Sequence, residues 1–368
     1  MADVLSIPPD SPRWEFEGQA ELAEYRQRKS IFLRSGAAGV KDLELRDGVI
    51  DVDIAAPAKP TVFGLNRAFF GIQFRGNPDN GSAEWVYLRP HKSGLADALQ
   101  YTPVLANSAV WQIYNGPGFT GKIDIPKDEW FHLRLEIAGA QARLYVEDMD
   151  KPCLVVDDLK SGNRKGGISL VNLTGPVYFS NFEVRELPPA PWQRHLPPMP
   201  ANTLTQWSLS PDYDALERNL ERPLSQTERD AITWQDVTAE PPGFVVINRY
   251  RKSPSVNVTF QNDFSTRLVP QKGMRVVYAR TSIASERDQV KKLNIGYSDD
   301  VSVFLNGRIL FRGRSAQGFR DPGFLGIVNL ENDAVYLPLR KGTNELVLAV
   351  SELGGGWGFI CRLDDPAS

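Results

Sequence analysis

The sequence predicts an all-β protein: two antiparallel β-sandwich (jelly-roll) domains joined by a proline-rich linker. Short runs of alternating apolar and polar residues recur between turn residues in both halves of the chain. A stretch with six prolines, at 188–200, separates the halves. The 368 residues also exceed the roughly 250 at which a single core stops growing. We therefore expect domains at 1–186 and 203–368, with a linker at 187–202.

The first domain is predicted from strands in which every second residue is apolar. The clearest runs are 70–75, 85–89, 131–137 and 143–147. This alternation is typical of strands with one buried face. Many such strands with polar turns favour a sandwich over a parallel α/β sheet.

The linker follows from proline chemistry, because proline lacks a backbone N–H and fixes φ, which excludes an interior strand. It reads as a stiff, extended connector, and Trp192 is placed to fasten it to one of the domains. One or two short helices should open the second domain. Ser210-Pro211 predicts a helix over 211–220, and the capping-box pattern Ser225…Glu228 predicts another over 225–232.

The rest of the second domain reads as strands. Asn306-Gly307 lies between two apolar runs and predicts a tight hairpin, because both turn positions need positive φ. Two late strands follow, around 346–350 and 357–361. The second domain is therefore expected to be another β-sandwich.

Composition excludes several function classes. The formal net charge of −3 gives no electrostatic footprint for nucleic acid or an anionic membrane. Cys153 and Cys361 are too few for a disulfide framework, and no Cys/His cluster has zinc spacing. The N-terminus has neither the basic nor the apolar region of a signal peptide, and no apolar run reaches membrane-spanning length. We expect a cytoplasmic protein.

Residues 14–186 resemble the concanavalin A-like, laminin-G-like jelly-roll domains. The resemblance rests on Phe-Phe-Gly-Ile-Gln-Phe-Arg at 69–75, Glu-Trp-Phe-His-Leu-Arg-Leu-Glu-Ile at 129–137, Gly-Gly-Ile-Ser-Leu at 166–170 and Val-Tyr-Phe-Ser-Asn-Phe-Glu-Val at 177–184. In domains of this kind with enzymatic or lectin function, a concave sheet face is a usual ligand site, so the resemblance implies a carbohydrate ligand.

Residues 203–365 resemble the galactose-binding-like jelly roll that forms the sugar-binding domain of family-2 glycosidases. The match rests on Asp-Asp-Val-Ser-Val-Phe-Leu-Asn-Gly at 299–307 and Leu-Pro-Leu-Arg-Lys-Gly-Thr-Asn-Glu-Leu at 337–346. These motifs mark hairpins and strand entries, not ligand contacts. Function must be argued from a site.

Strand parity predicts a ligand face in the first domain. If Phe70, Ile72 and Phe74 point into the core, their neighbours point outward. The outward set combines aromatic rings with Arg and Gln, which suit stacking on sugar rings and forked hydrogen bonds to hydroxyls. Its members are Gln73, Arg75, Trp85, Tyr87, Arg89, His91, Gln112 and Tyr114. The alternative is an interface between domains or subunits, where Trp, Tyr and Arg are also enriched.

Catalysis is the second hypothesis. Glu84 shares the parity of Val86, so it lies at a strand start or is a buried acid with a raised pKa. Tyr87 and His91 supply the base and acid types of a polysaccharide lyase, but the motifs of the jelly-roll alginate lyases are missing. Asp51 and Asp53 share a face and read as the solvent side of a strand.

His132 alternates with core residues on a regular strand. No metal or cofactor is expected from spacing, although Asp299-Asp300 and 329–333 supply oxygens for a structural calcium ion, which both resembled folds often carry. Three function classes therefore stay open. The preferred one is binding of an oligo- or polysaccharide. The alternatives are a glycoside hydrolase or polysaccharide lyase, and a structural protein that assembles as a homo-oligomer.

Overall fold

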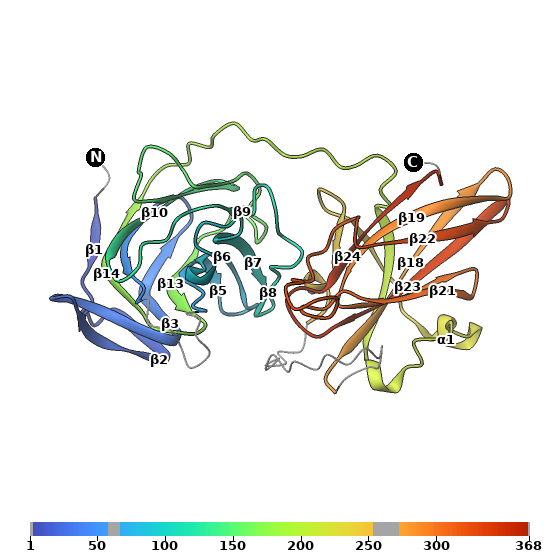
Figure 1. Ribbon diagram of the computed structural model, residues 1–368, viewed down its shortest axis with the longest axis horizontal. Coiled ribbons are helices and arrows are strands. Elements are labelled where there is room, and N and C mark those ends of the chain that lie inside the picture. Colours follow the sequence, from blue (N-terminus) through green and yellow to red (C-terminus); the bar gives the residue numbers. More distant parts are fainter. Residues whose placement is uncertain (1–2, 58–66, 253–271, 367–368) are drawn as a thin grey trace. The chain divides into compact units, whose positions relative to one another are not determined.

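The structure is a computed structural model that describes residues 3–57, 67–252 and 272–366 (Figure 1). Antiparallel strands dominate it, and the described residues contain one α-helix, α1 (Gln226–Ala231), besides short 3-10 turns. The all-β fold class is thereby confirmed. No helix within the described ranges is long and apolar enough to cross a membrane.

The chain divides into two compact units. Unit 1 consists of residues 1–107 and 114–196, and unit 2 of residues 108–113 and 197–368. The strands of unit 1 are β1 (Leu5–Ile7), β2 (Trp14–Tyr25), β3 (Arg28–Leu45), β4 (Gly48–Ala55), β5 (Phe70–Asn77), β6 (Ser82–Leu88), β7 (Leu99–Leu105), β9 (Thr120–Gly121), β10 (Trp130–Ala138), β11 (Gln141–Val146), β12 (Leu154–Val156), β13 (Gly166–Asn172) and β14 (Val177–Glu186).

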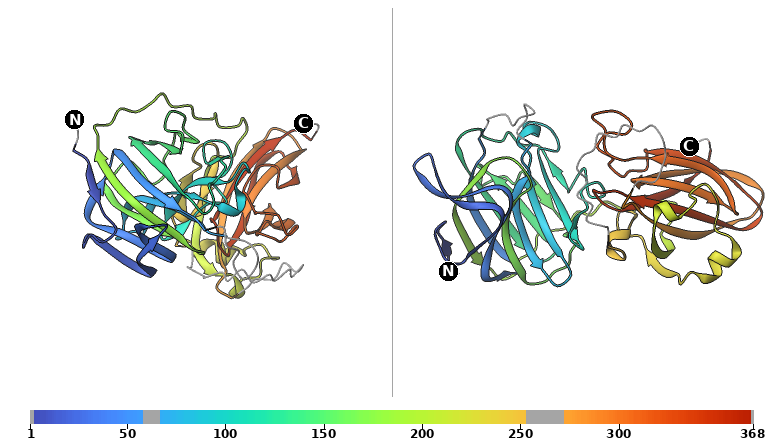
Figure 2. Two further views of the ribbon diagram at one scale, coloured as in Figure 1. Left: turned by 60° about the vertical axis from the view of Figure 1, so that its left-hand side comes forward. Right: turned by 90° about the horizontal axis from the view of Figure 1, so that it is seen from below.

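Unit 1 is one continuous sheet curled on itself, with strand order β12-β11-β10-β4-β14-β3-β13-β5-β6-β7. The curl depends on the long strand β3. Its residues 31–33 pair with β14 and its residues 36–45 pair with β13, so one strand belongs to both halves of the sheet. β2 pairs with β3 along its length, and the two form the long hairpin visible in Figure 2.

The predicted parity of unit 1 is confirmed at its core. Phe70, Ile72, Phe74, Val86 and Leu88 are fully buried and belong to a single apolar cluster. β10 alternates in the same way, with its odd-numbered residues Phe131 to Ile137 buried and its even-numbered residues partly exposed. The even-numbered positions therefore form an outward face.

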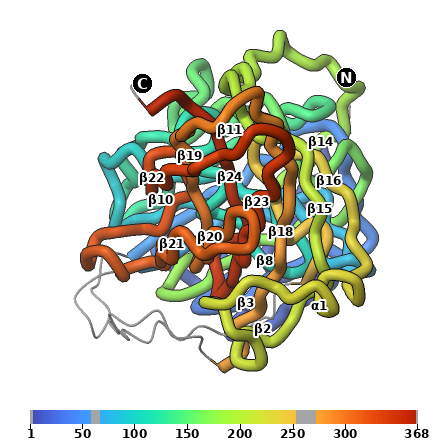
Figure 3. The backbone as a smooth tube through the Cα atoms, turned by 90° about the vertical axis from the view of Figure 1, so that its right-hand side faces the viewer, coloured from blue at the N-terminus to red at the C-terminus, as the bar shows by residue number. Residues whose placement is uncertain are grey.

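Unit 2 is a sandwich of two antiparallel sheets, whose strands can be followed in Figure 3. The six-stranded sheet has the order β16-β15-β18-β23-β20-β21, and the four-stranded sheet has the order β17-β24-β19-β22. The strands are β15 (Gln206–Asp214), β16 (Gln235–Thr238), β17 (Phe244–Val246), β18 (Arg275–Ser285), β19 (Gln289–Ser298), β20 (Asp300–Leu305), β21 (Arg308–Arg314), β22 (Asp333–Leu339), β23 (Gly342–Glu352) and β24 (Gly358–Asp364), with the short β8 (Ser108–Ala109) preceding them in the chain.

Two local predictions for unit 2 are confirmed and one is wrong. Asn306 and Gly307 have φ of 49° and 77° and join β20 to β21 as a hairpin. Ser225 caps α1 with both bonds of the capping box. The helix predicted over 211–220 is instead strand β15 followed by a 3-10 turn at Ala215–Glu217. Pro211 is accommodated there because the register of β15 against β18 shifts between residues 209 and 212.

Residues 187–200 contain neither helix nor strand, as proline requires. The Arg143 guanidinium of unit 1 lies over the Trp192 ring, 4.1 Å from its centroid. Arg194 forms an ion pair of 2.7 Å with Asp158. The segment up to Leu196 accordingly packs on unit 1.

Candidate functional site

On the predicted ligand face of β5 and β6, the side chains stack on one another and form hydrogen bonds within the protein. The rings of Trp85 and Tyr87 stack with centroids 4.3 Å apart. The Tyr87 hydroxyl and Arg89 Nη2 both donate to Gln100 Oε1, at 2.7 and 2.9 Å. Gln73 lies opposite Trp85 in the register. Trp85, Tyr87 and Arg89 thus share a face as predicted, but each is only 3% exposed.

Arg75 leaves this face because the strand is irregular after Phe74. The β5–β6 register shifts there, and Arg75 has φ of 53°. Its fully buried guanidinium donates to the backbone carbonyls of Arg46 and Gly139, at 2.7 and 2.6 Å. Arg75 therefore ties loops of unit 1 together and lies away from the position that strict alternation predicts.

Gln112 and Tyr114 lie in a turn, and the outward strand positions predicted for them are wrong. Gln112 belongs to unit 2, where its Nε2 donates to the Leu325 carbonyl and its Oε1 accepts from the Ser298 hydroxyl, both at 2.9 Å. Tyr114 belongs to unit 1, and its carbonyl accepts from Gln100 Nε2 at 2.8 Å. The apolar-polar alternation of this short segment reflects burial of a turn.

His91 and Glu84 are not suited to act as a catalytic base and acid. Burial, followed by the nearby cations, lowers the pKa of His91 to about 4, so this ring is neutral at pH 7. Glu84 is fully buried, and burial raises its pKa despite hydrogen bonds from the Tyr101 hydroxyl and Ser161 N–H, at 2.7 and 2.9 Å. Glu84 lies on the core side of β6, opposite Phe74, and its oxygens are occupied by protein donors.

The Asp299 and Asp300 carboxylates, which were considered for calcium, have protein partners. The Asp300 carboxylate binds the Arg314 guanidinium through two bonds of 2.6 and 2.7 Å. Asp299 Oδ2 accepts from the backbone N–H of Leu353 at 2.7 Å. Within the described part of the chain, no group of three or more His, Cys, Asp or Glu side chains is arranged to hold a metal ion.

A different face of unit 1 brings a group of ionisable side chains together, most of them partly exposed. β4 lies between β10 and β14, and the register places Asp53 opposite His132 and Asp51 opposite Arg134. His132 and Arg134 are partly exposed and alternate with buried residues on β10. Their partners lie on the same face of β4, where Asp53 is partly exposed and Asp51 is only 6% exposed. On β14 a bulge between residues 180 and 183 gives Asn181 a φ of 50° and adds its amide to the group.

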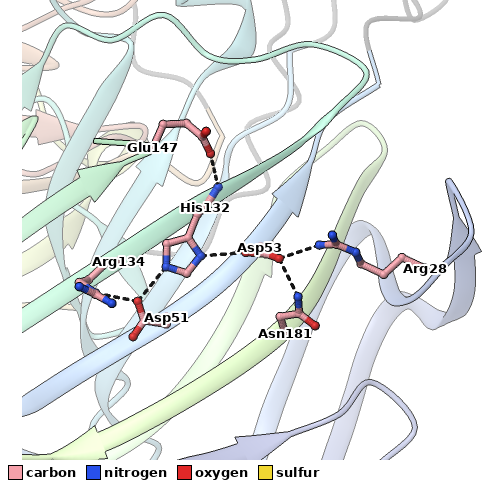
Figure 4. Close-up of polar contacts among 7 residues, drawn as sticks. All are labelled: Arg28, Asp51, Asp53, His132, Arg134, Glu147 and Asn181. Atoms are coloured by element: carbon pink, nitrogen blue, oxygen red, sulfur yellow. Dashed lines mark hydrogen bonds and ion pairs between the residues drawn. The ribbon is translucent and has the colours of Figure 1, made fainter. Parts of the chain in front are cut away.

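The His132 ring is held between the two carboxylates (Figure 4). Its Nδ1 lies 2.8 Å from Asp53 Oδ1 and its Nε2 lies 2.9 Å from Asp51 Oδ1. Asp51 also accepts from Arg134 Nε at 2.8 Å. Asp53 Oδ2 accepts from Arg28 Nη1 and Asn181 Nδ2, at 2.6 and 2.7 Å. Six side chains from four strands are thereby held in one arrangement.

Charge pairing sets the protonation states of this group. The bonds to Asp51 and Asp53 raise the pKa of His132 to about 9, which makes it an imidazolium at neutral pH. Partial burial works to raise the pKa of each carboxyl. The bonds from His132, with those from Arg134 and Asn181, outweigh burial and lower both values. Neither carboxyl can therefore act as a proton donor at neutral pH.

An aromatic edge borders the charged group. Trp130 precedes His132 by two positions on β10, and the Arg28 guanidinium lies 4.7 Å from its ring centroid. Tyr25 packs edge-on against Trp130 and stacks on Tyr178, with centroids 6.0 and 4.3 Å apart. The Trp130 indole N–H is buried and has no hydrogen-bond partner among the described residues. Arg28 therefore connects the carboxylates to the aromatic rings.

An open hollow of about 460 Å³ lies over these strands. Its lining consists of Val4, Asp51, Asp53, His132, Arg134, Asn181, Glu183 and Arg185. We call this surface the β4–β10–β14 face. Sequence reasoning missed it as a site, although it placed Asp51 and Asp53 together on a solvent-facing side. Alternation at 131–137 was the available signal, but nothing in the sequence states that β10 pairs with β4.

Comparisons with known proteins identify no family. No family model and no curated protein matches the chain. Solved structures do match, among them the carbohydrate-binding module CBM66 from Bacillus subtilis, at 15% identity and a TM-score of 0.35 over 46% of this chain and 94% of that one. A galectin-like protein of unknown function from Bacillus subtilis matches at 13% identity and a TM-score of 0.37, over 50% and 96% of the two chains. Bacillus licheniformis beta-glucanase matches at 10% identity and a TM-score of 0.36, over 50% of this chain and 98% of that one. These likenesses concern the fold.

Proposed function

We propose that this protein binds a glycan on the β4–β10–β14 face of unit 1, without cleaving it there. The observation that carries the proposal is the Asp51–His132–Asp53 arrangement, a fixed set of planar hydrogen-bonding groups beside the Trp130 ring. Sugar hydroxyls both donate and accept, so they match carboxylates next to Arg and Asn donors. Aromatic rings match the apolar faces of sugar rings.

Preorganisation supports binding at this face. Asp51 already has two side-chain partners and Asp53 has three, so little side-chain freedom is lost when a ligand arrives. The carboxylates keep lone pairs for hydroxyl donors, since an ionised carboxylate accepts about four hydrogen bonds. The hollow is shallow and open, which suits a stretch of an extended chain.

Protonation argues against hydrolysis at the same face. A glycosidase needs one carboxyl group that is protonated and a second that is ionised. Here the pKa of both Asp51 and Asp53 is lowered, and one imidazolium binds both. His132, with a pKa of about 9, is equally unsuited to act as a base at neutral pH.

Calorimetric titration with cellohexaose, xylohexaose, arabinohexaose and trigalacturonate tests the proposal, with mass spectrometry of the recovered sugars. We expect one of these classes to bind and to be recovered intact. His132→Gln should weaken binding at least tenfold, the order expected when a charge-assisted bond of about 1.5–3 kcal/mol is lost. His195→Gln is the matched control, because His195 lies in the linker and is 74% exposed.

Each result decides between the hypotheses. Equal affinity in the His132 and His195 variants would place the ligand elsewhere on the molecule. Shortened or unsaturated products would make the protein an enzyme. Absence of binding across the panel, combined with a self-associating species in sedimentation, would favour the assembly hypothesis.

A further inference from the structure

Unit 2 has an open hollow of its own, of about 490 Å³, on one side of the six-stranded sheet. The register places Asp236 of β16, Ser208 of β15 and Arg280 of β18 side by side across three neighbouring strands. The hollow is lined by these three residues together with Gln206, Trp207, Thr281, Ser282 and Glu345. It is built from a different unit and different strands than the β4–β10–β14 face.

Arg280 supplies unused donors in a fixed orientation. Its guanidinium lies over the Trp234 ring, 4.1 Å from the centroid. Among the described residues no hydrogen bond or ion pair engages this guanidinium, so its N–H groups are available. Stacking on an indole holds the planar fork without consuming these donors. The Trp234 indole N–H is also buried, and no described residue accepts a hydrogen bond from it.

Acceptors stand next to these donors. The Asp236 carboxylate accepts one bond in the described structure, from the Ser208 hydroxyl at 2.7 Å, and is exposed on its other side. Glu345 is neutralised by an ion pair with Arg229. Because Asp236 and Arg280 carry opposite charges, the hollow has no net charge to attract an ion. Its free groups match a neutral ligand rich in hydroxyls.

The arrangement repeats the chemistry found in unit 1. There Arg28 stacks on Trp130, here Arg280 stacks on Trp234, and in both places the indole N–H is buried without a partner. We infer that the outward face of β15, β16 and β18 is a second saccharide-binding surface, with Arg280 and Asp236 as its polar contacts. One chain would then offer two separate sites, which raises avidity for a polysaccharide without new contacts.

Indole N–H resonances of the full chain test this inference. The protein has eight tryptophans, and the peak missing from Trp234→Phe belongs to Trp234. We expect that peak to shift on addition of cellohexaose, xylohexaose or arabinohexaose. The shift should persist in His132→Gln, because the second surface does not depend on the first. Arg280→Lys should weaken the response at least fivefold, while Arg308→Lys, an exposed residue of β21, should leave it unchanged.

Two results would overturn the inference. One is a Trp234 peak that stays in place at saturating concentrations of every saccharide in the panel. The other is a Trp234 peak that shifts with the same midpoint saccharide concentration in the Arg280→Lys and Arg308→Lys variants. The Trp130 peak, assigned in the same way with Trp130→Phe, reports on unit 1 separately, so failure of either site is distinguishable from failure of the other.

Discussion

Two pairs of carboxyl groups, Asp51 with Asp53 in unit 1 and Asp299 with Glu352 in unit 2, differ in the charged partners that surround them. In unit 1, Asp51 and Asp53 lie on a partly exposed face, and each is bound by His132 and a further donor. In unit 2, Asp299 and Glu352 are 2% and 0% exposed, and Glu352 Oε2 has no hydrogen-bond partner in the described part of the chain. The two units therefore share the all-β fold class, while these two carboxyl pairs differ in their electrostatics.

The contrast appears in the directions of the pKa shifts. Partners lower the pKa of Asp51 and Asp53 against the opposing effect of burial. Burial, with the negative charge of Asp300 adding to it, raises the pKa of Asp299 to about 7. Burial and the nearby Asp299 raise the pKa of Glu352 further. Local pairing decides the ionisation of Asp51 and Asp53, whereas desolvation decides that of Asp299 and Glu352.

Arg75→Ala should have the largest effect, because it would create partnerless polar groups in the core of unit 1. The substitution leaves the Arg46 and Gly139 carbonyls, and part of Asp47, without their buried donor. We expect the free energy of unfolding of unit 1 to fall by about 3–5 kcal/mol in urea denaturation. Arg46→Ala is the control, since its side chain is 56% exposed and a change within about 0.5 kcal/mol is expected.

Glu352→Gln should instead stabilise unit 2 in alkaline solution. Because the folded-state pKa values of Glu352 and Asp299 are raised, their contribution to stability is greatest while they are protonated. This contribution to stability declines as pH rises above the pKa values of the unfolded chain, near 4. For Asp299 the decline ends near pH 7, the pKa of the folded state.

The variant keeps the shape of Glu352 and removes its ionisation. We expect about 1–3 kcal/mol more stability for unit 2 at pH 8.5 and a flatter decline with pH, measured by thermal unfolding. Glu331→Gln, an exposed substitution, should leave the pH profile as it is. An unchanged profile in the Glu352 variant would contradict the buried-charge account of unit 2.

His132→Gln should make unit 1 less stable in a pH-dependent way. Folding raises the pKa of His132 from 6.5 to about 9. The bonds of the charged ring to Asp51 and Asp53 therefore stabilise the fold fully below pH 6.5, and this stabilisation is lost as pH rises through 9. Allowing for solvent screening of a ring that is 35% exposed, we expect a loss of about 1–2 kcal/mol at pH 6 that disappears above pH 9.5. His195→Gln serves as the control, and a loss that is independent of pH would exclude this ion pairing as its cause.

Trp192→Ala should have the smallest effect and tests where the linker packs. Its stacking with Arg143 is worth about 0.5–1 kcal/mol at an exposed position. Losing it should increase the rate of tryptic cleavage at Arg194 by about two- to fivefold, while the unfolding of both units is unchanged. An unaltered cleavage rate would mean that the bonds of Arg194 and His195 to Asp157 and Asp158 hold the segment on unit 1 without this stacking.

Local signals predicted most of the secondary structure because they act within a few residues. The apolar alternation at 131–137, the Asn306-Gly307 turn and the Ser225 cap all appear in the structure as expected. Proline was misjudged once, at Pro211, where a shift in strand register accommodates a residue that also suits a helix start. A bulge, which depends on the partner strand, likewise removed Arg75 from its expected face.

The sequence by itself determined the fold class and the alternation that turns His132 and Asp53 outward, because alternation depends only on neighbours along the chain. The contact between His132 and Asp53 was decided by tertiary structure alone. It requires the pairing of β4 with β10, two strands remote in sequence whose register is set by burial of their opposite sides. The same holds for Arg280 and Trp234, and for the assignment of Gln112 to unit 2. A site assembled from several strands is a property of their pairing, which no single strand encodes.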